Sequence, residues 1–147
     1  MPETKRNLKF TKFQEFLKKN NINYFMVDEL HDEAQTVIFK SNVNVSQQLL
    51  PIGIITDHTI YTIIRVQVGK GLVKKENKTA FFEYLNNLNR SYKVFKYVAT
   101  DDGDIYLDSV LPSTNDSFDP EIVKLVLDVV VDHLQHEYPN IMKLAWA

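Results

Sequence analysis

Residues 36–68 read TVIFKSNVNVSQQLLPIGIITDHTIYTIIRVQV, and this stretch decides the fold. Three runs within it, Thr36–Val45, Gln48–Thr56 and Ile60–Val68, are rich in Val, Ile and Thr, residues that favour strands. The polar residues 57–59 separate the last two runs, as expected of a turn. We therefore expect consecutive antiparallel strands. Pro51 cannot donate a backbone hydrogen bond to a neighbouring strand, so the second run should be an edge strand or should bend there.

A helix and a further strand are predicted before this stretch. Large apolar side chains recur at intervals of three and four residues, at Phe10, Phe13, Phe16 and Leu17, which is the spacing of one helical face. The segment Tyr24–Leu30 then has the composition of a strand. The chain thus begins with a helix followed by three or four strands.

A second helix and a hairpin are predicted after it. Apolar residues share one helical face over Asn77–Asn89. Two further runs, Lys93–Thr100 and Asp104–Leu111, flank the pair Asp102 and Gly103. An Asp-Gly pair between two strands favours a tight hairpin, because glycine accepts the positive φ that the turn demands.

The last helix carries clear signals at both ends. Asp119 can cap its free amides, and Pro120 stands at the first helical position, where no amide hydrogen is needed. We expect the helix to end at Tyr138, because Pro139 follows. The predicted fold is a single α+β domain over residues 1–147, an antiparallel sheet with helices packed on one face in the order α-β-β-β-(β)-α-β-β-α.

The apolar arc of the last helix is wider than one contact requires. Ile122, Leu125, Val126, Val129 and Val130 cover one side of the helix. Val123, Leu127, Val131 and Leu134 extend the arc to roughly 180°, whereas a single sheet face needs a stripe of about 100°. A second surface must cover the excess. It is either the first helix of the same chain or a partner, and these four residues are the predicted partner-binding set.

Composition narrows the possible partners and compartments. The formal net charge is −2, which gives no overall field for binding nucleic acid, and there is no cysteine for disulfides or thiolate metal sites. The N-terminal residues lack the apolar run of a secretory signal, and no apolar stretch approaches the roughly 20 residues of a membrane-spanning helix. We expect a cytoplasmic protein with no nucleic-acid or membrane partner.

Charge is unevenly distributed along the chain. Residues 101–138 contain ten Asp and Glu and one lysine, whereas residues 69–96 contain seven Lys and Arg and two Glu. The unevenness reflects either pairing within the chain or electrostatic selection of a protein partner.

No motif assigns a reaction. His133 and His136 stand three residues apart on the last helix, but the pattern matches no zinc motif, so we predict no metal and no cofactor. His31 and His58 lie in polar segments typical of turns. No nucleophile elbow or phosphate loop is present. We therefore predict no catalytic residue.

The second half of the chain resembles the YbjN family, described as bacterial sensory-transduction regulators with a fold similar to that of type III secretion chaperones. The resemblance covers residues 77–139. It lies in the helix end Tyr84-Leu85-Asn86-Asn87-Leu88-Asn89, the hairpin around Asp101-Asp102-Gly103, the strand exit Leu111-Pro112, and the final helix closing with Tyr138-Pro139. It implies an α+β fold, often a dimer, with a binding or regulatory role and no assigned reaction or catalytic residue.

Two hypotheses of function follow. The first is a non-enzymatic protein-binding or regulatory module, chaperone-like or adaptor-like, which holds a protein partner or a second copy through Val123, Leu127, Val131 and Leu134 or through an exposed sheet edge. The alternative is a small-molecule-binding or catalytic protein with a pocket between sheet and helices, in which His31, His58 or His133 would carry protons.

Overall fold

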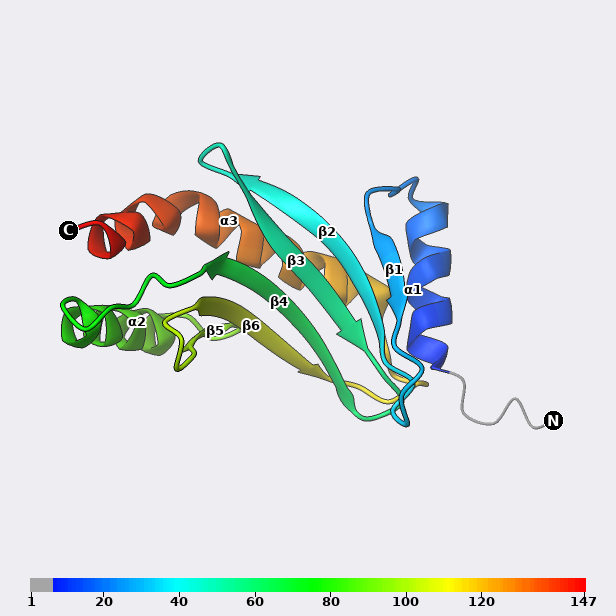
Figure 1. Ribbon diagram of the computed structural model, residues 1–147. Coiled ribbons are helices and arrows are strands. Elements are labelled where there is room, and N and C mark those ends of the chain that lie inside the picture. The colour runs from blue at the N-terminus through cyan, green and yellow to red at the C-terminus, as the bar shows by residue number, and fades with distance from the viewer. Residues whose placement is uncertain (1–6) are drawn as a thin grey trace.

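The computed structural model describes residues 7–147, which form three helices and six strands. In chain order these are α1 (Leu8–Lys19), β1 (Met26–Glu29), β2 (Val37–Val45), β3 (Gln48–Thr56), β4 (Tyr61–Gly69), α2 (Lys78–Ser91), β5 (Lys96–Ala99), β6 (Ile105–Pro112) and α3 (Pro120–Ala145) (Figure 1). The α+β class and the predicted order of elements are confirmed. Within the described residues, no helix is both long enough and apolar enough to cross a membrane.

The six strands form one antiparallel sheet in the order β1-β2-β3-β4-β6-β5. Successive side chains along each strand point to opposite faces. One row across the sheet is almost completely buried and consists of Phe39, Ile54, Ile64 and Ser109. Helix α3 lies behind the sheet on this buried side (Figure 1). The opposite side, which we call the open face, carries the alternate residues and includes Lys40, Gly53, Arg65 and Asp108.

An aromatic cluster joins α1 to the sheet and to the start of α3. The Phe13 ring lies 4.9 Å from that of Phe39 in an edge-on arrangement and 6.4 Å from that of Phe118, measured between centroids. Phe13 and Phe39 are fully buried. The first helix therefore packs against the last helix within the same chain. This is one of the two surfaces proposed to cover the wide apolar arc.

Two buried polar side chains fix the start of α1 against the sheet. The Lys9 ammonium is buried and donates to the carbonyl oxygens of Thr59 at 2.6 Å and Tyr61 at 3.1 Å. Burial lowers the pKa of Lys9, because it disfavours the charged form. The Asn7 amide donates to Thr56 Oγ1 at 2.9 Å. Both groups satisfy the rule that buried donors need partners, and they tie α1 to the β3–β4 turn.

Strand β3 is central in the sheet, so of the two alternatives predicted for this run, an edge strand or a bend at Pro51, the edge strand is wrong. Pro51 is tolerated because β4 begins to pair with β3 only at Ile52, so Pro51 has a partner, Asn42, on β2 alone. Because a two-residue loop joins Val45 to Gln48, Asn42 and Pro51 form a pair without hydrogen bonds between β2 and β3. The proline nitrogen therefore points away from β2, to the side where β4 does not pair with β3. At Pro51, β3 has a paired strand on one side only, as an edge strand has.

Helix α3 continues through Pro139 to Ala145, so the prediction that it ends at Tyr138 is also wrong. Proline removes one hydrogen bond from a helix interior. Tyr138, Ile141 and Ala145 are buried, whereas Pro139 itself is exposed. Burial of the last two turns offsets the lost bond, and the defect lies on the solvent side of the helix.

Candidate functional site

Three of the four residues predicted to bind a partner are buried within the subunit. Val123, Leu127 and Leu134 are at most 5% exposed, and Val131 is half-buried. The sheet and the other two helices all contact α3. The chain itself thus covers this part of the arc, and the prediction of a free surface at Val123, Leu127 and Leu134 is wrong.

The uncovered apolar side chains of α3 lie on its other flank. Ile122, Leu125 and Val129 are 51%, 64% and 49% exposed. They follow one another at intervals of three and four residues, so they form one stripe along the helix surface. The stripe is limited to the first half of α3, since His136 and Asn140 continue the same face.

Leu125 and Val129 of the stripe, together with Val126, form one wall of a groove whose other wall is the segment before β5. This hollow of about 460 Å³, the α3 groove, is lined by Ser91, Tyr92, Lys93, Val94, Phe95, Leu125, Val126 and Val129. Tyr92 and Val94 are themselves well exposed. The site is apolar over most of its surface, and both walls come from regular or tightly anchored segments.

Beside the groove lies a cluster of aromatic rings around His133. The imidazole is 4.5 Å from the ring centroids of both Tyr92 and Phe95. Its Nε2 is 2.6 Å from Tyr97 Oη, in a buried hydrogen bond. The residue is 7% exposed.

Burial makes this cluster uncharged at neutral pH. The pKa of His133 is lowered to about 4, mainly by burial and also by the nearby His136, while Asp132 opposes the shift. Burial also raises the pKa of the Tyr97 hydroxyl above its ordinary value. A neutral imidazole bonded to a neutral phenol is a satisfied pair in a packed environment. The geometry therefore assigns His133 a packing role.

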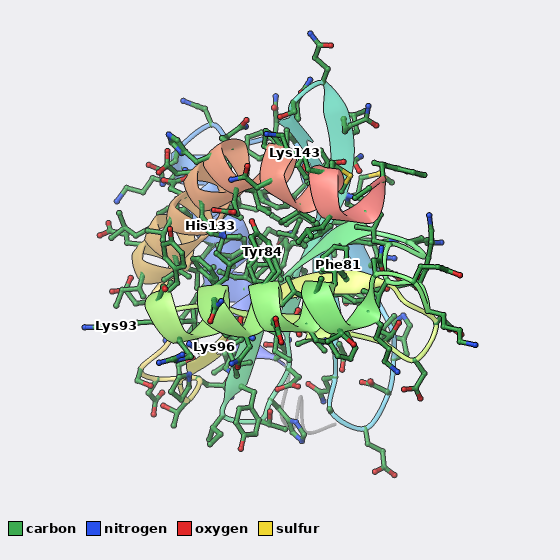
Figure 2. All side chains as sticks on the ribbon, turned by 90° about the vertical axis from the view of Figure 1, so that its left-hand side faces the viewer. Phe81, Tyr84, Lys93, Lys96, His133 and Lys143 are labelled. Carbon is green, nitrogen blue, oxygen red and sulfur yellow. The ribbon has the colours of Figure 1, made fainter. Side chains whose placement is uncertain are left out.

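The surroundings of the α3 groove carry charges of opposite sign. The α3 wall itself is apolar; Asp128 and Asp132 lie beyond it on the same helix, where they line a hollow between α3 and β2, and Asp128 accepts a 2.6 Å hydrogen bond from Lys124. On the other side are Lys93 and Lys96. Figure 2 shows Lys93 pointing outward beyond the last turn of α2.

The segment beside the groove is held by bonds to the end of α2. Lys96 Nζ donates to the carbonyl oxygens of Asn89 at 2.5 Å and Tyr92 at 2.7 Å. The Asn89 side chain also receives the Tyr97 N–H at 2.7 Å and donates to the Tyr97 carbonyl at 3.2 Å. Asn89 thereby occupies the outer edge of β5, so the hypothesis of an exposed sheet edge does not hold at Tyr97.

The structure does not bring the three candidate proton carriers into one site. His31 and His58 are exposed in the loops after β1 and β3, whereas His133 is buried on α3. Among residues 7–147, no three His, Asp or Glu side chains are grouped closely enough to hold a metal ion.

The alternative hypothesis of a pocket between sheet and helices has a structural counterpart. A hollow of about 500 Å³ lies between α3 and β2, and its lining includes Leu127, Val131 and Asn44. Gln135 Nε2 donates to the Asn44 carbonyl at 2.7 Å and bridges the two elements there. Two of the predicted partner-binding residues, Leu127 and Val131, thus line this hollow.

The sequence contained a signal that separates the two flanks of α3. The buried positions of α3 continue at helical spacing past Pro139, from Tyr138 to Ile141 and Ala145. The exposed apolar stripe ends at Val129. A helix that ends at Tyr138 hides this difference between the two flanks. Tyr92 and Val94 gave no signal of their own.

Comparison with known proteins adds no assignment to this geometry. No family model matches the chain, and no curated protein is similar to it in sequence.

Proposed function

We propose that this protein is a non-enzymatic, cytoplasmic protein-binding module, of the chaperone or adaptor kind, and that the α3 groove is its contact surface. One observation carries the proposal. Ile122, Leu125 and Val129 remain about half exposed or more, although the same chain buries the rest of the apolar arc of α3. Large apolar side chains left together on a surface are typical of protein interaction sites.

The apolar stripe supplies a moderate share of a binding energy. Full burial of a Leu, Ile or Val side chain contributes about 1.5–3 kcal/mol, so covering the exposed halves of the three contributes about 3 kcal/mol in total. Association costs at least about 4 kcal/mol in lost translational and rotational freedom. A contact centred in the groove would also cover the exposed Tyr92 and Val94 and would so add to the apolar burial.

The charges on the two sides of the groove favour a second copy of the chain as this partner. A two-fold axis running along the groove would set the α3 side of one copy, where Asp128 and Asp132 lie beyond the apolar wall, against the side of the other copy that carries Lys93. An axis across the groove would oppose like charges. The charge pattern thus favours one orientation of a homodimer.

The test compares two leucines of equal exposure. Leu125 is 64% exposed in the groove and Leu49 is 67% exposed in the β2–β3 hairpin. In sedimentation equilibrium we expect the wild type and Leu49→Asp to dimerise alike. Leu125→Asp should raise the dimer dissociation constant at least about tenfold, because it buries a charge in the contact.

A wild type that stays monomeric would rule out the second copy. Immobilised wild type, Leu49→Asp and Leu125→Asp would then be compared for retained proteins. A retained set that Leu125→Asp leaves unchanged would refute the α3 groove as the binding surface.

A further inference from the structure

The open face of the sheet holds a larger hollow than the α3 groove. It measures about 620 Å³, within the range of small-molecule sites, and we call it the open-face hollow. Its lining comes from β1 to β4 and β6 and includes Met26, Ile38, Lys40, Gly53, Ile55, Arg65 and Tyr106. No residue of the α3 groove contributes to it.

Gly53 opens the floor of this hollow. It stands in the cross-strand row between Lys40 on β2 and Arg65 on β4. A Cβ atom at this position would lie 3.3 Å from Ile38 Cγ2, a close contact that the glycine avoids. The missing side chain leaves a depression between two cationic residues, with Ile38 and Ile55 beside it.

Arg65 is oriented over the open face with donors to spare. Its Nε and Nη2 each donate to one carboxylate oxygen of Asp108 at 2.9 Å. This pair uses one edge of the guanidinium, and the Tyr106 ring lies 5.7 Å from its central carbon. A guanidinium has five N–H donors, so the edge formed by Nη1 and Nη2 can donate to a second carboxylate.

Lys40 faces the same hollow from the other side of Gly53. Its ammonium is 2.7 Å from Asp28 Oδ2, which uses one of three donors. Strand spacing sets the Cα atoms of Lys40 and Arg65 about 10 Å apart, so both long side chains can reach an anion above Gly53. Asp28 and Asp108 are absent from the lining, so the groups that face the hollow are cationic or uncharged.

We propose that the open-face hollow binds a small carboxylate with an apolar body. The carboxylate lies above Gly53, where it accepts hydrogen bonds from the free edge of Arg65 and from Lys40. The hydrocarbon or aryl body lies on Ile38 and Ile55. This inference is independent of the α3 groove, because the two sites share no residue and lie on different faces of the fold.

The experiment uses the full chain, uniformly labelled with ¹⁵N, and sodium octanoate as the probe below its micelle concentration. We expect amide shifts centred on Gly53, Lys40 and Arg65. Arg65→Gln should weaken octanoate binding about tenfold, because it removes a charge-assisted hydrogen bond at a partly exposed site. Gly53→Val should abolish binding, because the new side chain fills the depression.

Three controls decide the outcome. Arg90→Gln removes an exposed arginine at the end of α2 and should leave octanoate binding unchanged. Octanol and octylammonium should bind more weakly than octanoate, because octanol has no negative charge and octylammonium has no acceptor. Equal binding of octanol, shifts centred elsewhere, or an unchanged affinity in Arg65→Gln would each overturn the proposal. Lys40→Gln replaces Arg65→Gln if that variant does not give the dispersed spectrum of the folded chain.

Discussion

Acidification should destabilise this fold through His133. The unfolded imidazole has a pKa near 6.5, whereas burial lowers the pKa of His133 in the folded chain to about 4. Below pH 6.5 the unfolded chain binds a proton that the folded chain does not. The contribution of His133 to stability is therefore present above pH 6.5 and is lost as the pH falls toward 4.

The two pKa values set the size of the loss. Linkage gives a decrease in the free energy of unfolding of about 2 kcal/mol at pH 5 and about 3 kcal/mol at pH 4, relative to pH 7. This is a large share of the roughly 5–15 kcal/mol that stabilises an ordinary domain. The carboxylates of the protein add their own dependence, so a variant must isolate the part due to His133.

Urea unfolding at pH 7, 5 and 4 measures the effect. His133→Gln keeps a neutral partner for the Tyr97 hydroxyl and removes the titration, so its stability should fall less than that of the wild type by the amounts above. His136→Gln, at an exposed position one turn further along α3, should keep most of the pH dependence of the wild type, because burial contributes more than His136 to the lowered pKa of His133. Parallel pH profiles for the wild type and His133→Gln would show that the imidazole is not kept neutral by burial, and the reasoning would fail.

Two backbone substitutions test the turn and the helix. Gly103 has φ of 85°, and a Cβ there would lie 2.3 Å from the carbonyl oxygen of Val73, so Gly103→Ala should lower the free energy of unfolding by about 3 kcal/mol. Gly71→Ala, also at positive φ but with no atom within 4 Å of the added Cβ, should cost about 1 kcal/mol in the same denaturation experiment, and equal losses would contradict the steric argument. Pro139→Ala should restore the hydrogen bond to the Gln135 carbonyl and raise the melting temperature, with a gain of about 1–3 kcal/mol; a lower melting temperature would show that the proline already fits α3 without cost.

Local patterns were sufficient to predict the elements and their order. Alternating Val, Ile and Thr over residues 36–68 gave strands at Val37–Val45, Gln48–Thr56 and Tyr61–Gly69. Asp119 caps α3 as predicted, accepting from the Glu121 N–H at 2.9 Å. Signals of this kind act within a few residues, so they do not depend on the rest of the fold.

The errors at the two prolines have a common origin. Because proline removes a backbone donor, Pro51 predicted an edge strand or a bend, and Pro139 predicted the end of the helix. In the structure, Pro51 lies where β4 does not pair with β3, so no acceptor lacks a donor there. At Pro139 the burial of neighbouring residues of α3 offsets the lost hydrogen bond. The sequence shows that each proline lacks a backbone donor, but only the neighbouring strands or helix turns decide whether the element ends there.

By itself, the sequence determined that α3 has more apolar surface than one sheet face can cover, because helical periodicity follows from the order of residues alone. Which flank stays uncovered was decided by the tertiary structure. The sheet, α1 and α2 contact α3 and bury Val123, Leu127 and Leu134, which leaves Leu125 and Val129 exposed. The hollow at Gly53 likewise exists only once β2, β3 and β4 are in register, because residues far apart in the chain must meet to form it.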